Sequence, residues 1–278
     1  MKIGVTIHAT DLAMSPVALG PEAEARGFHS LFIPEHTHIP TSRKTPPPTG
    51  GDTLGQEYLR SLDPYIALAA TAARTERIRL GTGIGLVAQH DPITFAKELA
   101  TLDQVSNGRL VLGIGYGWNI EEMENHGIDT RRRRARVREC MLAMQALWSN
   151  EVAEFHGEFV DFAPSWQWPK PLQQPRPPVL IGGAAGPKLF DHIAEYADGW
   201  LPIGGAGVKE ALAQLREAFV ANGRDPAGLH VAPMGIVPSE EKLAYYREVG
   251  VTEAVLRVPS APRDVVMPVL DEYARYLA

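Results

Sequence analysis

The sequence alternates eight times between segments with strand character and segments with helical period. Short apolar runs of β-type composition recur along the chain, and amphipathic segments separate them. The predicted strands cover 2–7, 29–34, 78–84, 109–114, 178–182, 199–203, 229–236 and 253–258, and the predicted helices cover 16–26, 64–74, 92–106, 131–149, 187–196, 208–222, 239–249 and 264–277. Strands that alternate with helices form parallel sheets, and eight such units can close into a barrel. The pattern therefore predicts an α/β fold, a (β/α)8 TIM barrel, with a doubly wound open sheet as the alternative.

Three of the predicted helix starts are marked by a capping residue followed by proline. These pairs are Ser15-Pro16, Asp63-Pro64 and Asp91-Pro92. The capping oxygen accepts a hydrogen bond from a free N–H group of the first turn, and proline at the first helical position loses no bond. These pairs predict helices that begin at 16, 64 and 92.

Two segments depart from the plain alternation. Residues 37–62, after the second strand, form a long loop rich in Pro, Gly and Thr, which is typical of a lid or binding loop, with a disordered loop as the alternative. Residues 150–176, between the fourth and fifth strands, contain an alternating stretch about His156-Gly157 that predicts a hairpin, followed by a proline-stiffened strap. The length of 278 residues suits one such barrel, and no linker divides it, so we predict a single domain over 1–278.

The composition restricts the classes of partner. The net charge of -6 argues against general affinity for nucleic acid or an anionic membrane, which favours a small-molecule substrate. Cys140 is the only cysteine, so no internal disulfide can form. The sequence shows no signal-peptide pattern and no apolar run long enough to span a membrane, and we expect a cytoplasmic protein.

The candidate site residues follow the predicted strands, because barrels of this type carry their sites at the carboxyl ends of the strands. Glu35 and His36 follow the second strand. His36 is a candidate general acid or base, and the alternative is a structural or solvated histidine. The glycine-rich turn Gly182–Gly186 precedes a helix and is a candidate phosphate site, although such turns also serve tight packing. No pair of histidines has the helical spacing of a metal site, so we predict no metal.

Longer motifs carry a family resemblance. The segment "RIRLGTGIGLVAQHDPITFAKELATLDQVSNGRLVLGIGYGWN", residues 77–119, resembles the luciferase-like monooxygenase superfamily in the order and spacing of its motifs. The likeness extends to "GFHSLFIPEH" at 27–36, "PPVLIGG" at 177–183 and "ADGW" at 197–200. The resemblance implies a (β/α)8 barrel whose mouth binds a flavin or a deazaflavin, in a protein that is usually a homodimer.

The resemblance also implies a non-prolyl cis peptide after the third strand, here Gly83–Ile84. The long insertion after strand two, the "GWN" turn and the "ADGW" strand look most like the branch that uses coenzyme F420, a deazaflavin, with FMN as the alternative cofactor. By similarity, Glu35 and His36 lie beside the ring as catalytic residues. The implied cofactor-binding residues are Thr82, Gly83 and Ile84 behind the ring, Gly115, Tyr116, Gly117 and Trp118 on its other side, and Gly182, Gly183, Ala184 and Gly186 at the phosphate.

The implied activity is hydride transfer between F420 and a small, uncharged or hydrophobic substrate, with a proton supplied by His36 or a water. Trp118 replaces the acidic residue of the sugar-phosphate dehydrogenase members, and Tyr116 stands where bacterial luciferase has arginine, so neither glucose 6-phosphate oxidation nor light emission is expected. Two other interpretations stay open. One is an FMN-dependent monooxygenase that uses reduced flavin and oxygen, and the other is a catalytically idle cofactor-binding protein on the same barrel.

Overall fold

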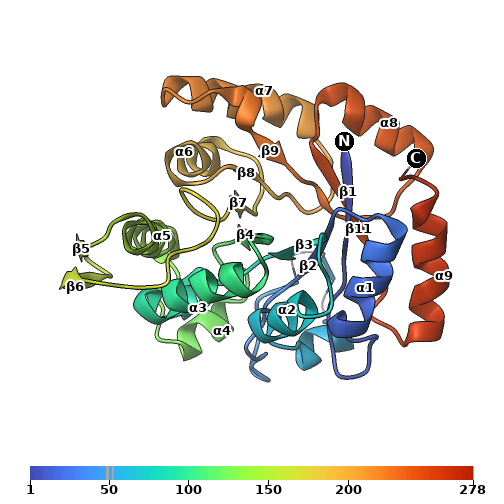
Figure 1. Ribbon diagram of the computed structural model, residues 1–278, viewed down its shortest axis with the longest axis horizontal. Helices are drawn as coiled ribbons and strands as arrows, with labels where there is room; N and C mark the ends of the chain where they lie inside the picture. Colours follow the sequence, from blue (N-terminus) through green and yellow to red (C-terminus); the bar gives the residue numbers. More distant parts are fainter. Residues whose placement is uncertain (48–49, 52, 278) are drawn as a thin grey trace.

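Nine parallel strands form one curled sheet in the computed structural model, which describes residues 1–47, 50–51 and 53–277 (Figure 1). Their order is β10-β11-β1-β2-β3-β4-β7-β8-β9. The strands are β1 (Lys2–Thr6), β2 (Ser30–Ile33), β3 (Arg79–Thr82), β4 (Leu110–Ile114), β7 (Val179–Ile181), β8 (Gly199–Trp200), β9 (His230–Val231), β10 (Met234–Ile236) and β11 (Glu253–Arg257). The predicted α/β fold with a parallel sheet is confirmed.

The two ends of this strand order are neighbours in the chain. Only Ala232 and Pro233 separate β9 from β10, and the single run predicted at 229–236 is broken there. Ala232 N–H donates to the Trp200 carbonyl (2.9 Å), whereas the Pro233 carbonyl accepts from Val255 N–H (3.0 Å). The segment therefore bonds to β8 on one side and to β11 on the other.

Helices cover the outer face of the sheet. They are α1 (Pro16–Arg26), α2 (Pro64–Ala72), α3 (Pro92–Val105), α4 (Ile120–Asn125), α5 (Arg133–Ser149), α6 (Pro187–Tyr196), α7 (Val208–Ala221), α8 (Glu240–Val249) and α9 (Arg263–Ala274), with 3-10 turns η1 (Gln56–Arg60), η2 (Val87–Gln89) and η3 (Pro226–Gly228). The predicted starts of α1, α2 and α3 are confirmed, because Ser15, Asp63 and Asp91 each accept a backbone N–H of the first turn. The short helix α4 was not predicted.

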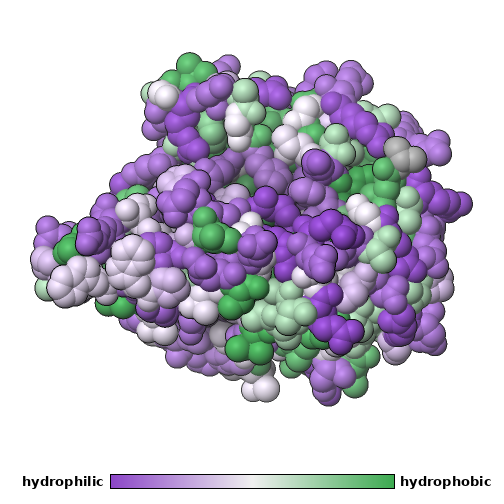
Figure 2. All heavy atoms as spheres, viewed as in Figure 1, coloured by the Kyte–Doolittle hydropathy of each residue, from purple (hydrophilic) through white to green (hydrophobic). Residues whose placement is uncertain are grey.

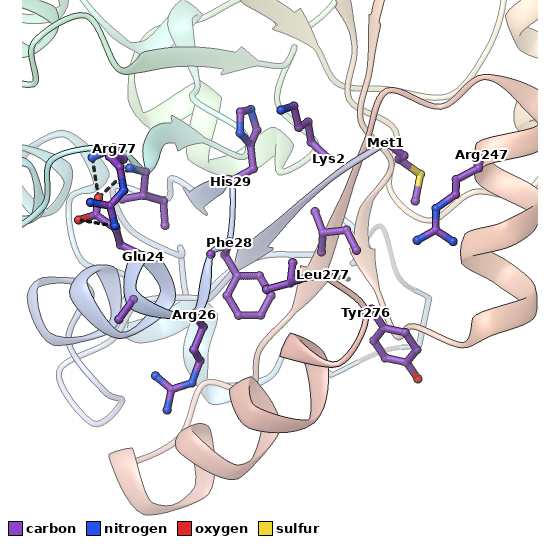
Figure 3. Close-up of a pocket in the computed structure, with 14 residues that line it drawn as sticks. Met1, Lys2, Glu24, Arg26, Phe28, His29, Arg77, Arg247, Tyr276 and Leu277 are labelled. Atoms are coloured by element: carbon purple, nitrogen blue, oxygen red, sulfur yellow. Dashed lines mark hydrogen bonds and ion pairs between the residues drawn. The ribbon is translucent and has the colours of Figure 1, made fainter.

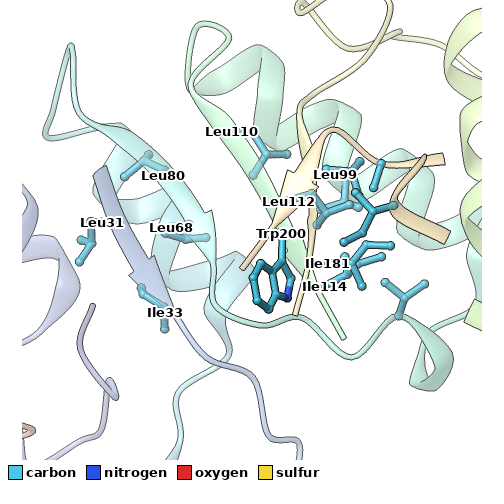
Figure 4. Packing of buried hydrophobic residues seen from close by; sticks show 14 of the residues in the cluster. Leu31, Ile33, Leu68, Leu80, Leu99, Leu110, Leu112, Ile114, Ile181 and Trp200 are labelled. Atoms are coloured by element: carbon cyan, nitrogen blue, oxygen red, sulfur yellow. The ribbon is translucent and has the colours of Figure 1, made fainter. Parts of the chain in front are cut away.

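Alternation along the strands produces two apolar layers. Leu31 and Ile33 of β2 face the helices, where they join the large core with Leu110, Leu112 and other residues (Figure 4). Phe32, between them, points to the other face of the sheet. There it joins a smaller buried cluster with Val111, Leu180, Leu201, Ala232, Met234 and Val255. This inner cluster fills the space that the curled sheet encloses.

The segment between β4 and β7 carries a separate antiparallel pair, β5 (Ala153–His156) and β6 (Asp161–Ser165), which projects from the body of the protein (Figure 1). The following strap lies along α3. Gln167 Nε2 donates to the Ile93 carbonyl (2.9 Å), and Gln173 Nε2 donates to Asp103 Oδ1 (2.7 Å). The loop predicted at 37–62 contains η1, and its residues 48, 49 and 52 lie outside the described residues.

The molecular surface in Figure 2 is mostly hydrophilic, with small, separate hydrophobic areas. In the part of the chain that the structure describes, no helix combines the length and apolar character needed to cross a membrane. This surface gives no sign of one large apolar patch on the face shown.

We predict that Gly199→Ala destabilises the fold. A Cβ atom at Gly199 would lie 1.8 Å from the His230 carbonyl oxygen, and backbone on a paired strand cannot move aside. We expect a loss of about 3 kcal/mol in the free energy of unfolding, measured by urea denaturation. Gly186→Ala is the control, because its Cβ would meet nothing within 4 Å. Equal losses for the two variants would contradict the packing argument.

Candidate active site at the carboxyl ends of the strands

The turns after β3, β4 and β7 meet around Ile84. The Gly83–Ile84 peptide bond is cis, as the resemblance implies. Ile84 packs against the inner apolar cluster. A Cβ atom at Gly115 would lie 1.9 Å from Ile84 Cδ1, and one at Gly182 would lie 2.8 Å from Ile84 Cγ2. The structure thus brings together three of the predicted turns, and glycine is needed at two positions for Ile84 to fit between them.

Backbone hydrogen bonds fix these turns. Gly85 N–H donates to the Gly113 carbonyl (2.7 Å), and Gly115 N–H donates back to the Gly85 carbonyl (3.0 Å). The Thr82 hydroxyl also donates to the Gly113 carbonyl (2.7 Å). Gly182 N–H donates to the Ile114 carbonyl (2.7 Å). The ends of three adjacent strands are therefore rigidly joined at the mouth of the sheet.

The Glu35 carboxylate is buried and fully engaged by the protein. Its Oε1 accepts from His90 Nε2 (2.7 Å), and its Oε2 accepts from Leu86 N–H (2.6 Å) and the Tyr65 hydroxyl (3.1 Å). Burial opposes protonation of His90, but the hydrogen bond and charge of Glu35 outweigh it and raise the pKa of the His90 imidazole. Glu35 thereby holds the segment that follows Ile84.

His36 forms a dyad with a carboxylate that the sequence analysis did not single out. His36 Nδ1–H donates to Glu122 Oε2 (2.7 Å), and the Trp118 indole N–H donates to His36 Nε2 (3.2 Å). In this arrangement Nε2 of His36 is the acceptor and Nδ1 is the donor. Glu122, on α4, is 1% exposed and also accepts Thr37 N–H (3.1 Å). The acidic start of α4 directly after the "GWN" turn is the sequence signal that could have found it.

Three aromatic rings lie close to the His36 ring. The His36 ring centroid lies 5.5 Å from that of Trp118 and 5.5 Å from that of Tyr58, which comes from η1 in the long loop. His8, after β1, lies 6.5 Å from His36 and bonds to the Ser61 hydroxyl (2.8 Å). Burial, followed by repulsion from His36, lowers the pKa of His8 to about 4. His8 is therefore neutral at physiological pH, and the Arg43 guanidinium lies 6.0 Å from the centroid of the Trp118 ring.

The two aromatic residues of the "GYGWN" turn point to different neighbours. Trp118 lies on His36, whereas the Tyr116 hydroxyl bonds to His192 Nδ1 on α6 (2.8 Å). The Arg134 guanidinium lies 4.6 Å from the centroid of the Tyr116 ring. Gly117, which lies between Tyr116 and Trp118 in the chain, has a φ of 80°. This backbone conformation favours glycine and lets the two aromatic side chains point in different directions.

Asn119, the last residue of that turn, is 1% exposed, and neither its amide oxygen nor its amide nitrogen has a partner within the described part of the chain. A buried amide without hydrogen bonds is costly and needs an explanation. It is a second residue near His36 that the sequence analysis did not place in the site.

The turn after β7 presents backbone to the surface. Gly183 and Ala184 are exposed, and the Gly183 carbonyl accepts the Trp200 indole N–H (2.9 Å). Gly186 begins α6 without a side-chain capping bond, unlike the Ser and Asp residues that cap α1, α2 and α3. Pro187 has no N–H, and Leu189 N–H donates to the Gly186 carbonyl (3.0 Å), so among the described residues the Lys188 N–H is the donor of the first turn that is left for an anion.

The helix α4 also fastens the long loop. Glu121 Oε1 accepts Lys44 N–H (2.7 Å) and Thr45 N–H (3.2 Å), and Glu121 Oε2 accepts the Thr45 hydroxyl (2.7 Å). Burial acts against ionisation, but these hydrogen bonds prevail and lower the pKa of Glu121 to about 2. The carboxylate is thus ionised throughout the neutral range, and the tether is lost only as pH falls through about 2.

We predict that Glu121→Gln loosens this loop. The amide loses the charge that three donors share, so trypsin should cut after Arg43 or Lys44 about three to ten times faster, because local opening becomes more frequent. The measurement is the rate of the first cleavage at pH 8. Glu124→Gln, at an exposed position of the same helix, should leave the rate unchanged. Unchanged cleavage in Glu121→Gln would show that other contacts hold the loop.

Comparison with known proteins adds the family. Residues 8–256 match the sequence profile described as luciferase-like monooxygenase. The chain belongs to this family. Within the described residues, no group of three or more His, Cys, Asp or Glu side chains is arranged to hold a metal ion.

This luciferase-like chain is similar in sequence to one uncharacterized protein and to two enzymes with different cofactors. An uncharacterized protein of Mycobacterium tuberculosis is 42% identical over 282 residues, covering 100% of this chain and 99% of its own. An F420-dependent glucose-6-phosphate dehydrogenase of Kineococcus radiotolerans is 28% identical, covering 81% of this chain and 64% of its own. The oxygenase component of a flavin-dependent trigonelline monooxygenase of Acinetobacter baylyi is 38% identical, covering 57% of this chain and 40% of its own.

Solved structures share the fold. The monooxygenase RslO1 of Streptomyces bottropensis superposes with a TM-score of 0.78 at 23% identity, covering 100% of this chain and 98% of that one. An F420-dependent secondary alcohol dehydrogenase, in complex with an F420-acetone adduct, superposes with a TM-score of 0.77 at 17% identity, covering 99% and 97%. At these identities the likeness supports the architecture alone.

Proposed function

We propose that this luciferase-like protein is a coenzyme F420-dependent oxidoreductase that transfers a hydride between the deazaflavin and a small, uncharged or hydrophobic organic substrate. The observation that carries the proposal is the buried His36–Glu122 dyad beside the turn that holds Ile84. A histidine paired with a carboxylate can accept or donate one proton. Interconversion of an alcohol and a carbonyl requires the transfer of one such proton in addition to the hydride. The relative from Kineococcus, which matches most of the chain, supports the choice of cofactor.

The proposal includes the closed form of the fold. We take β9 and β10 as two halves of one strand interrupted at Pro233, so that the sheet is an eight-stranded (β/α)8 barrel. The hairpin of β5 and β6 and the loop after β2 are then insertions in the barrel. The homodimer and the cytoplasmic location stay predictions.

Two features of the described residues fit a deazaflavin with a phosphate-bearing side chain. The orphaned amide of Asn119 offers a donor and an acceptor at a buried position, which suits the polar edge of a flat heterocycle. Gly182, Gly183, Ala184 and Gly186 lead to an uncapped helix start, which suits a phosphate. Thr82, Gly83 and Ile84 would support one face of the ring, and Gly115, Tyr116, Gly117 and Trp118 would border it.

The bound deazaflavin would supply or take up the hydride. His36 holds the proton site at Nε2, which accepts a hydrogen bond in this structure and can accept a proton from a substrate hydroxyl. Glu122, held by His36 and Thr37, keeps the imidazole oriented and stabilises its positive charge when it becomes protonated. In the reverse direction the same nitrogen returns the proton to a carbonyl oxygen.

Other residues orient the substrate and exclude water. His8, Tyr58 and Trp118 form an apolar aromatic wall beside His36, which favours substrates without charge. The tether from Glu121 keeps the loop over this wall. The Glu35 carboxylate already accepts three hydrogen bonds from the protein, so we propose that it is a positioning residue, in place of the catalytic role first predicted for it.

The first test is a pair of titrations of the purified protein with oxidised F420 and with FMN, followed by quenching of tryptophan fluorescence. We expect F420 to bind at least tenfold more tightly, a difference of about 1.4 kcal/mol. The reverse preference would support the second candidate, an FMN-dependent monooxygenase, which the local similarity to the trigonelline enzyme favours. Binding of neither cofactor would contradict both.

The variant Asn119→Leu makes this test residue-specific. Because the amide has no partner among the described residues, its loss should leave the melting temperature unchanged or raise it, while the Kd for F420 should increase about tenfold. A clear fall in melting temperature with unchanged affinity would assign Asn119 a purely structural role.

We also predict that the dyad acts as a unit. With a substrate found by screening alcohols and enones, His36→Gln should lower kcat by about 10² without preventing F420 binding. Glu122→Gln should lower kcat less, and the double variant should lose no more than His36→Gln alone, because Glu122 acts through His36. Additive losses would indicate that the two residues act separately.

A further inference from the structure

A hollow lies at the amino ends of the first strands, the opposite end of the sheet from the candidate active site (Figure 3). Its volume is about 680 Å³, and it lies where β1, β2 and β3 begin. The last turn of α1, the turn before β3, the last turn of α8 and the segment after α9 form its walls. This volume is within the range of small-molecule sites.

The charges around this hollow are strongly positive, although the chain as a whole carries -6. Among the described residues, its basic lining side chains are Lys2, Arg26, Arg77 and Arg247, and its acidic one is Glu24. Figure 3 shows Arg77 on one side and Arg247 on the opposite side. Basic side chains gathered around one cavity raise its local potential even in an acidic protein.

Several of these charges are not neutralised by the protein. Arg26 is paired with Glu22 and Asp271, but Lys2 and Arg247 have no side-chain hydrogen bond or ion pair within the described residues. Arg77 is exposed. Within the described residues, its one ion pair joins Nη2 to Glu24 Oε1 at 4.0 Å.

The Glu24 carboxylate is itself occupied. It accepts the backbone N–H groups of Glu76, Arg77 and Ile78, with the last two at 2.6 and 2.8 Å from Oε2. It therefore closes the turn before β3 and cannot reach across the hollow to the cations on the other side.

His29 also lines the hollow. Burial is the main factor that lowers the pKa of the His29 imidazole, and Lys2 and Arg79 add to the effect, although Glu253 opposes it. Below the charged rim, the hollow has an apolar floor of Ile3, Phe28 and Ile78, which are at most 5% exposed.

We propose that this hollow is a binding site for a phosphorylated small molecule. The guanidinium of Arg247 and the ammonium of Lys2 bind phosphate oxygens, since guanidinium and ammonium groups are the preferred partners of phosphate in proteins. The apolar floor and Tyr276 contact the organic part of the ligand. The site is separate from the proposed deazaflavin site and does not depend on it.

The experiment is a calorimetric titration of the full chain with pyrophosphate as the probe, accompanied by NMR spectra of the histidine rings. We expect saturable binding in the millimolar range or tighter, weakened by salt, with the His29 ring resonances shifting toward the protonated form. Arg247→Gln, an exposed change that the fold tolerates, should weaken binding about tenfold.

Lys209→Gln is the matched control, because it removes one exposed positive charge from α7 without touching the hollow. It should change the Kd by less than about twofold, and Lys2→Gln should behave like Arg247→Gln. Equal weakening by Lys209→Gln, shifts at His36 or His192 in place of His29, or no saturable binding would each overturn the proposal.

Discussion

The close contact of Ile84 with the turns after β4 and β7 is the constraint on which the candidate site depends. Ile84 rests on the inner apolar cluster, and Gly115 and Gly182 leave the space that its side chain fills. Glu35 then fixes the following segment by hydrogen bonds from Leu86 N–H and His90 Nε2. A side chain at either glycine would displace Ile84, so the positions of these three turns relative to each other are set together.

The short helix α4 joins the chemistry of the site to the loop that covers it. Glu122 orients His36, and the adjacent Glu121 holds Lys44 and Thr45 of the long loop. Because Glu121 and Glu122 are successive residues of one helix, a movement of the loop that shifts Glu121 would also shift Glu122 and its hydrogen bond to His36. The structure thus links the position of the long loop to that of the His36–Glu122 pair.

The two ends of the sheet differ in electrostatic character, so they suit ligands of different charge. The carboxyl end presents aromatic rings and a carboxylate-paired histidine, whereas the basic side chains of Lys2, Arg26, Arg77 and Arg247 line a hollow at the amino end. An uncharged substrate at one end and a phosphorylated ligand at the other would each meet the surface that suits it. The intervening inner cluster of apolar side chains keeps the two regions apart.

The sequence by itself determined the alternation of strands and helices, the capped starts of α1, α2 and α3, and the resemblance that located the cis peptide at Gly83–Ile84, because each depends on neighbouring residues. Only the tertiary structure decided the roles of Glu35 and Glu122. The partners that turn Glu35 into an anchor lie 30 to 55 positions away in the chain, and Glu122 reaches His36 across 86 positions. The interruption of the seventh predicted strand at Pro233 and the cationic hollow likewise arise from segments that meet only when the sheet curls, and no local pattern records such a meeting.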